Sequence, residues 1–209
     1  MSHLFEAIPF VKNELYEKII TDIGAQKFCI IDDFFTSDEV VKLRESLMIR
    51  FEEDAFRKSA IGNKTNEVIK QAVRGDLIFW IDEQIGNAAE QLFFKKINDL
   101  KDYLNRTCFM GIGHKEFHYA IYPKGTFYKR HLDTFQNDDR RKLSFVCYLN
   151  SENWQAENGG ELVLYLDKED KFIYPFPGKV VIFESQIIEH EVKPVNTQRL
   201  SITGWLKTH

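Results

Sequence analysis

The sequence predicts a mainly β fold with flanking α-helices: a double-stranded β-helix (jelly-roll) barrel packed against N-terminal helices. Apolar residues recur at helical spacing through the first half of the chain. After about residue 116, short runs rich in Val, Ile, Phe, Tyr and Leu alternate with turn residues. Strands that follow one another without intervening helices form antiparallel sandwiches or barrels.

The length and composition fit one domain over residues 1–209, with a mostly helical N-terminal layer at 1–115 and the barrel at 116–209. The chain has 209 residues, 44% of them hydrophobic, which is enough for a sizeable core. The net charge is -4 and no basic stripe is visible, which argues against a nucleic-acid partner. We see neither a secretory signal nor an apolar run of roughly 20 residues, so we expect no membrane association. Three widely spaced cysteines without a CxxC motif favour a reducing, cytoplasmic location.

The N-terminal layer contains two clear helices and a longer third one. Residues 11–23 carry apolar side chains at helical spacing, and an apolar run at 28–35 then predicts a strand. Thr36 and Glu39 form a capping box that opens the second helix. Residues 84–106 predict the third helix, whose apolar stripe we expect to pack against a sheet.

The barrel is predicted from six strand-like runs separated by turns. They are residues 117–123, 142–150, 160–166, 179–184, 189–194 and 199–207. Glycine-containing turns at 158–160 and 177–179 separate some of these runs. We therefore expect the helices to lie outside the barrel.

The segment His131-Leu132-Asp133 is the first candidate for chemistry. Residues two apart on a strand point to the same face, so this imidazole and this carboxylate can converge on one ion. His190, in another strand-like run, is a candidate third ligand. Two histidines and a carboxylate leave part of an octahedral ion open, which suits non-haem Fe(II). Taken alone, a His-x-Asp pair more often consists of two surface residues than of metal ligands.

The last two runs predict a carboxylate-binding group beside this site. If residues 195–198 form a hairpin loop, His190 faces Thr203, and the polar residues of the final strand share the face of His190. That set is Arg199, Ser201, Thr203 and Trp205. A buried arginine needs a carboxylate partner, and a bound ligand can supply one to its planar fork. The alternative is that Arg199 is an exposed arginine on a strand.

Tyrosines are further candidates for this pocket. Tyr148 shares one face of its strand with Ser144 and Val146, and a buried hydroxyl seeks a partner such as a carboxylate. Tyr122 and Tyr128 lie just before His131. Tyr128 is more consistent with aromatic packing in the core.

Taken together and in order, these motifs resemble the prolyl-hydroxylase-type Fe(II)/2-oxoglutarate-dependent dioxygenases. The resemblance spans residues 117–207 and rests on the segments at 122–123, 131–133, 147–150, 159–162, 177–178, 190–192 and 199–202. It implies that His131, Asp133 and His190 are the iron ligands and form the catalytic centre. It also implies that Arg199 and Thr203 bind the distal carboxylate of 2-oxoglutarate, assisted by Tyr148 and Tyr122. Ascorbate is a further cofactor that the resemblance suggests.

The segment Arg74-Gly75-Asp76, followed by Trp80, resembles a segment of the oxygen-sensing prolyl 4-hydroxylases and their bacterial relatives. The resemblance implies a substrate lid at about 54–76, with a polar composition that suits a mobile loop. We therefore expect Arg74, Asp76 and Trp205 to contact the substrate. The stretch 184–189 lacks the basic residues of the animal oxygen sensors, and 201–205 is closer to the broader group that includes ribosomal-protein prolyl hydroxylases.

The expected function is hydroxylation of a prolyl residue in a protein, such as a translation factor or a ribosomal protein. Two alternatives stay open at this point. An oxygenase of the same fold can act on a free amino acid or a small metabolite. A non-enzymatic binding module of this fold would be expected to have lost one of the ligands or the arginine, and all are present in this sequence.

Overall fold

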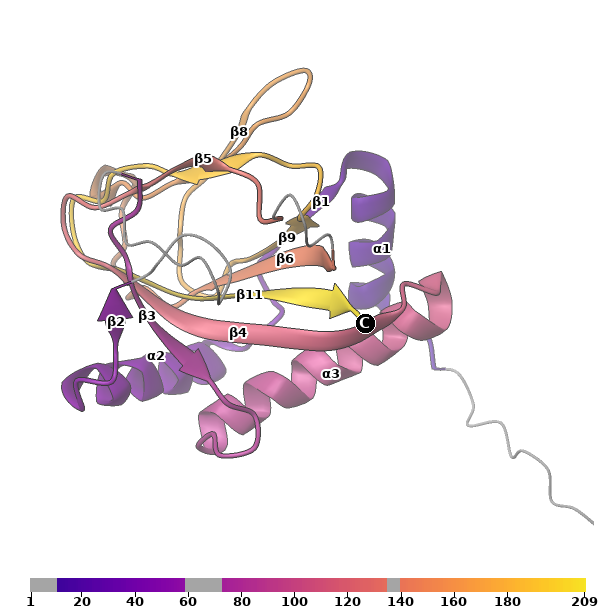
Figure 1. Cartoon of the computed structure of the whole chain (residues 1–209), viewed down its shortest axis with the longest axis horizontal. Coiled ribbons are helices and arrows are strands. Elements are labelled where there is room, and N and C mark those ends of the chain that lie inside the picture. Colours follow the sequence, from indigo (N-terminus) through magenta and orange to yellow (C-terminus); the bar gives the residue numbers. More distant parts are fainter. Residues whose placement is uncertain (1–10, 59–72, 135–139) are drawn as a thin grey trace, which may run out of the picture.

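Two antiparallel sheets face each other in the computed structural model, which describes residues 11–58, 73–134 and 140–209 (Figure 1). The larger sheet contains, in spatial order, β1 (Phe28–Ile31), β9 (Val180–Glu184), β6 (Arg141–Tyr148), β11 (Arg199–Thr208), β4 (Ile112–Tyr122), β3 (Leu77–Ile81) and β2 (Arg57–Lys58). The smaller sheet contains β5 (Tyr128–His131), β10 (His190–Val192), β7 (Leu162–Leu164) and β8 (Lys171–Ile173). Each of the six predicted runs contains a strand, whereas β2, β3, β5 and β8 lie outside the predicted runs.

Three helices cover the outer face of the larger sheet: α1 (Glu14–Gln26), α2 (Ser37–Glu52) and α3 (Ala88–Cys108) (Figure 1). A short 3-10 helix, η1 (Ala156–Asn158), precedes β7. Among the residues described, no helix combines the length and the apolar character needed to cross a membrane.

Capping residues set where the helices begin. The predicted capping box of Thr36 and Glu39 is confirmed at the start of α2. The other two helices begin three or four residues later than predicted, because Asn13 and Asn87 accept hydrogen bonds from the first-turn backbone N–H groups. Asn87 and Glu90 form a second capping box.

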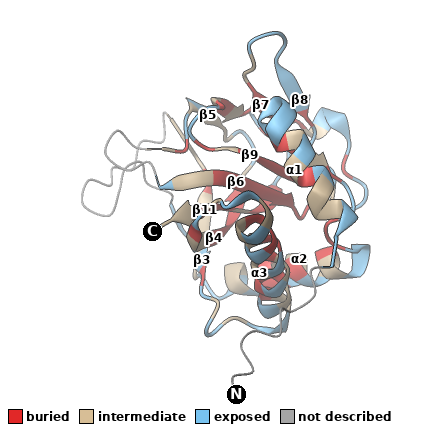
Figure 2. Cartoon of the chain, turned by 90° about the vertical axis from the view of Figure 1, so that its right-hand side faces the viewer, coloured by how far each residue is buried: buried red, intermediate tan, exposed pale blue. Residues whose placement is uncertain are grey.

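The core has two layers, one on each side of the larger sheet (Figure 2). Side chains alternate between the two faces of β6. Leu143 and Phe145 pack against the helices, whereas Val146 and Tyr148 lie in the space between the sheets. Phe145 and Phe93 of α3 lie in contact, with ring centroids 6.1 Å apart. The side chains on the inner face therefore line the space where the predicted site lies.

The hairpin predicted between residues 189–194 and 199–207 is wrong. β10 pairs with β5 and β7 of the smaller sheet, whereas β11 pairs with β4 and β6 of the larger one. The connecting residues cross from one sheet to the other, and Val195 bonds to the backbone of Gly125 and Thr126 instead. His190 and Thr203 therefore belong to different sheets, although both line the cavity between them.

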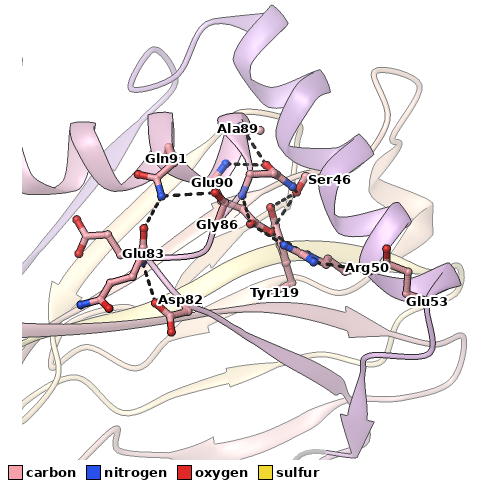
Figure 3. Close-up of polar contacts among 12 residues, drawn as sticks. Ser46, Arg50, Glu53, Asp82, Glu83, Gly86, Ala89, Glu90, Gln91 and Tyr119 are labelled. Atoms are coloured by element: carbon pink, nitrogen blue, oxygen red, sulfur yellow. Dashed lines mark hydrogen bonds and ion pairs between the residues drawn. The ribbon is translucent and has the colours of Figure 1, made fainter.

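A buried polar network joins α2, α3 and β4 behind the larger sheet (Figure 3). Glu90, only 1% exposed, accepts hydrogen bonds from Arg50 at 3.1 and 3.3 Å and from the hydroxyl of Ser46 at 3.2 Å. Tyr119 of β4 donates to the same serine at 3.0 Å. Because Arg50 also lies over the ring of Phe79 in β3, the network ties the helices to the strands of the site.

Replacement of Glu90 with Ala should lower the free energy of unfolding by about 3 kcal/mol, because it leaves a partly buried arginine and a buried hydroxyl without their partner. Urea unfolding followed by circular dichroism measures this change. Glu53→Ala is the matched control, since Glu53 also pairs with Arg50 but is 57% exposed. It should change stability by less than about 1 kcal/mol. Equal losses for the two variants would contradict the assignment.

Candidate metal and dicarboxylate site

The space between the sheets holds a cavity of about 500 Å³, a size typical of small-ligand sites. Eight of the ten residues predicted for the site line it: Arg74, Tyr122, His131, Asp133, His190, Arg199, Thr203 and Trp205. The other two, Asp76 and Tyr148, are buried but are not part of the lining.

His131, Asp133 and His190 converge in the wall of the cavity. His131 ends β5, His190 begins β10, and these two residues are paired across the strands. Asp133 lies two residues beyond the end of β5, so the prediction that it shares this strand is wrong, but its carboxylate still turns back toward both imidazoles. Its oxygens lie 3.4 Å from Nε2 of His131 and 3.6 Å from Nε2 of His190. One ligand atom from each residue lies within 4.8 Å of the others, which suits a shared metal ion.

Backbone carbonyls set the orientation of both imidazoles. Nδ1 of His131 lies 2.7 Å from the carbonyl oxygen of Lys129, and Nδ1 of His190 lies 3.2 Å from that of Ile188. Each pair is a hydrogen bond when Nδ1 carries the proton. That tautomer leaves the Nε2 lone pairs free to bind a metal, as in most histidine metal sites.

The protonation states of the buried ligands also suit metal binding. Burial is the main cause, and the neighbouring His131 the second, of a pKa of His190 lowered to about 4. Burial alone would raise the pKa of Asp133, but the two histidines and a hydrogen bond from Ser144 outweigh it and lower that pKa. A neutral imidazole and an ionised carboxylate are the forms that bind metals.

Two residues that support Asp133 were not predicted. Ser144 donates to Oδ2 of Asp133 at 2.6 Å, and Arg141 donates to its backbone carbonyl at 3.0 Å. The alternation that pointed to Tyr148 also places Ser144 on the inner face, so that signal was present in the sequence. Nothing in the local sequence singles out Arg141, whose guanidinium stacks 3.5 Å from the ring centroid of Trp205.

Arg199 lines the same cavity and is only 2% exposed. Its guanidinium lies 4.9 Å from the ring centroids of both Tyr122 and Tyr148. Within the described residues, Nε of Arg199 and the hydroxyl of Tyr148 have no hydrogen-bond partner. A buried arginine with an unused donor beside an unpartnered hydroxyl fits a ligand carboxylate.

Gly160 makes room for this arginine. It has a φ of +71°, and a Cβ atom there would lie 2.8 Å from Cδ of Arg199. Only glycine tolerates both the positive φ and this close approach. The glycine pair recognised as a turn in the sequence therefore also shapes the surroundings of Arg199.

His118 is a cavity residue that sequence reasoning left unassigned. It lies between Trp80 and Trp205, with ring-centroid distances of 4.8 and 5.7 Å. Burial, followed by the positive charge of Arg74, lowers its pKa to about 4, so the imidazole is neutral near pH 7. Trp80 remains 49% exposed and forms an apolar rim at the cavity.

Comparison with known proteins places this geometry in a family. Residues 117–207 match the model of the 2OG-Fe(II) oxygenase superfamily. The crystal structure of a Pseudomonas putida prolyl-4-hydroxylase superposes with a TM-score of 0.84 at 33% identity, covering 93% of this chain and 100% of that one. The chain is a prolyl-hydroxylase-type 2OG-Fe(II) oxygenase. The predicted jelly-roll fold is confirmed by this likeness.

Two more relatives support the same family. A Trichoplax adhaerens prolyl hydroxylase, solved with a hypoxia inducible factor peptide fragment, has a TM-score of 0.83 at 28% identity, over 92% of this chain and 89% of that one. A PKHD-type hydroxylase of Synechococcus sp. (strain CC9605) is 36% identical over 89 residues. That match covers 41% of this oxygenase and 38% of the Synechococcus protein.

A divalent metal should stabilise this oxygenase through the three converging side chains. At a free Mn(II) concentration 100 times its dissociation constant, we expect a gain of about 2.7 kcal/mol. That gain corresponds to a rise in Tm of roughly 5–10 °C for a domain of this size. Differential scanning fluorimetry of the metal-stripped protein measures the shift.

Asp133→Asn should abolish the metal-induced shift. The matched control is Asp170→Asn, an exposed acid in the loop between β7 and β8, which should leave the shift unchanged. A full shift in the Asp133 variant would place the metal elsewhere.

Proposed function

We propose that this protein is an Fe(II)- and 2-oxoglutarate-dependent dioxygenase that hydroxylates a prolyl residue of a polypeptide. One observation carries the proposal: a buried arginine whose Nε donor has no partner within the described residues lines the same cavity as a two-histidine, one-carboxylate cluster. The first group suits the distal carboxylate of 2-oxoglutarate, and the second suits a non-haem iron.

Each side chain has a defined task in this proposal. His131, Asp133 and His190 would hold the iron through Nε2, a carboxylate oxygen and Nε2. Arg199 would bind the distal carboxylate, with the hydroxyl of Tyr148 as a second donor. Thr203 and Tyr122 line the same cavity and would complete the 2-oxoglutarate pocket. When bound, iron and 2-oxoglutarate supply the oxidising chemistry that converts a C–H bond to an alcohol.

Apolar side chains line part of the cavity wall and would limit the access of water to this chemistry. Val146, Leu162 and Val192 line the cavity and are at most 7% exposed. An apolar wall strengthens the interaction of Arg199 with a carboxylate, because charges attract more strongly where water is absent. It also limits side reactions with solvent.

Several features support a polypeptide as the substrate. The half-exposed ring of Trp80 and the ring of Trp205 give the cavity aromatic surfaces suited to a prolyl ring. Among the similar structures, the Trichoplax adhaerens enzyme was solved with a peptide fragment bound. The proposal extends to a translation factor or ribosomal protein as the source of the proline, to a cytoplasmic location and to ascorbate as a cofactor. Residues 59–72, most of the expected lid, lie outside the described residues.

The decisive experiment incubates the purified protein with Fe(II), 2-oxoglutarate, oxygen and a panel of proline-containing polypeptides. We expect succinate to form in proportion to peptides that gain one oxygen atom on proline, measured by mass spectrometry. Succinate without any modified peptide would contradict the prolyl assignment. Hydroxylation of a free amino acid or metabolite in its place would support the small-molecule alternative. His131→Ala that retains turnover would contradict the proposed iron site.

Arg199→Lys should raise the KM for 2-oxoglutarate about 10- to 100-fold. Lysine cannot make the two parallel hydrogen bonds of a guanidinium, and a hydrogen bond to a charged group contributes about 1.5–3 kcal/mol. Calorimetric titration of 2-oxoglutarate into the Mn(II)-loaded protein measures the affinity directly. Arg106→Lys, at an exposed arginine at the end of α3, is the control and should leave the affinity unchanged. Equal affinities for the two variants would contradict the role of Arg199.

A further inference from the structure

The Arg74–Asp76 segment lies against β5, the strand that ends in the metal-ligand candidate His131. Arg74 forms an isolated antiparallel bridge with Tyr128. Around it, Gly75 N–H donates to the Phe127 carbonyl at 3.1 Å and Lys129 N–H donates to the Val73 carbonyl at 2.9 Å. The segment therefore runs beside β5 in the smaller sheet and then enters β3 of the larger sheet.

Gly75 permits this close approach. A Cβ atom at position 75 would lie 2.8 Å from both Cβ and Cγ2 of Thr126, closer than real side-chain contacts. Any larger residue would push the segment away from β5. Packing against Thr126 therefore explains why the Arg-Gly-Asp motif contains a glycine, without any contact to substrate.

Arg74 and Asp76 form a buried ion pair against the ring of Tyr128. Nε and Nη2 of Arg74 donate to the two carboxylate oxygens at 2.8 and 2.6 Å, and the two side chains are 12% and 1% exposed. The guanidinium carbon lies 4.3 Å from the centroid of the Tyr128 ring. Bidentate pairing fixes the plane of the guanidinium, and the cation is attracted to the ring face.

Tyr128 in turn stacks on the imidazole of His131. Their ring centroids are 3.6 Å apart and their planes differ by 17°. Residues three apart on a regular strand point to opposite faces. A bulge changes this: Tyr128 and His131 lie opposite Val192 and His190, so three steps on β5 match two on β10. Bulges near active sites commonly re-aim a side chain in this way.

We propose that Arg74, Gly75 and Asp76 form a clamp that orients the metal ligand His131 through the ring of Tyr128. The motif is then a positioning element of the metal site, which differs from the substrate contact expected from the sequence. The clamp also joins the sheets, because Arg74 leads into β3 while Tyr128 and His131 belong to β5. This inference rests on the proposed metal site and assigns the residues that support it.

The test measures metal affinity without substrate or turnover. Mn(II) or Co(II) is titrated into the metal-stripped protein, and the Co(II) absorption spectrum reports the ligand geometry. Arg74→Lys and Asp76→Asn should each weaken metal binding about 10- to 100-fold, the usual effect of losing a group that orients a ligand. Tyr128→Phe should keep the wild-type affinity because the ring remains, whereas Tyr128→Leu should lose it to the same extent as Arg74→Lys.

A matched control lies on the same strand. Arg130 pairs with Glu189 and lies 3.9 Å from the ring centroid of Tyr165, so it repeats the arginine–acid–tyrosine arrangement. The side chains of Arg130 and Glu189 are 50% and 44% exposed. Among the described residues, no ring contact joins Tyr165 to His131 or His190. Arg130→Lys should leave metal affinity unchanged.

The outcomes separate the clamp from its alternatives. Unchanged metal affinity in the Arg74 and Asp76 variants, with a raised KM for a proline-containing polypeptide, would overturn the clamp in favour of substrate contact. Equal losses in Tyr128→Phe and Tyr128→Leu would also overturn it, because stacking would then be irrelevant. A wild-type protein that binds no metal would instead contradict the proposed function. Tm values of the metal-free variants identify any loss of metal affinity that comes from unfolding. The comparison of Tyr128→Phe with Tyr128→Leu then decides whether ring stacking orients His131.

Discussion

The pairing of β11 with β4 on one side and β6 on the other is the constraint on which the rest of the structure depends. Strand alternation forces the residues of these strands into two sets. Leu200, Ile202 and Leu206 join the core beneath the helices, whereas Arg199, Thr203 and Trp205 face the cavity. A shift of one residue would bury the apolar set in the cavity and drive a charged arginine into the helix-facing core. The free-energy cost of that exchange fixes the register.

The site is divided between the two sheets, so its chemistry depends on the space between them. The two histidines lie on the smaller sheet, while the arginine and its tyrosines lie on the larger one. Asp133 connects the halves, because it follows β5 and accepts a hydrogen bond from Ser144 of β6. The Arg74–Asp76 pair makes a second connection beside β5. The short segments around Asp133 and Arg74 thus connect the two sheets that form the site.

The buried charges on the two sides of the larger sheet have different partners. Glu90 and Arg50 satisfy each other behind the sheet, in a network closed by Ser46. Arg199, in front of the sheet, has a donor with no partner within the described residues. The Glu90–Arg50 pair has its hydrogen bonds made within the folded protein, so it needs no ligand. Arg199 has the arrangement expected where binding, and not folding, completes the hydrogen bonds.

The sequence by itself determined the periodic elements and the chemical types of the site residues. The existence of three helices follows from local spacing, although two of them begin three or four residues later than the spacing predicted. Alternation explains why Arg199 lies on the face opposite the apolar residues of its strand. Local rules do not determine which strands pair, so the predicted hairpin between β10 and β11 was wrong. They also did not place Asp133 beyond its strand, or Tyr128 on His131 through a bulge. Only the tertiary structure decided these points, because they depend on hydrogen bonds and packing between segments that are distant in sequence.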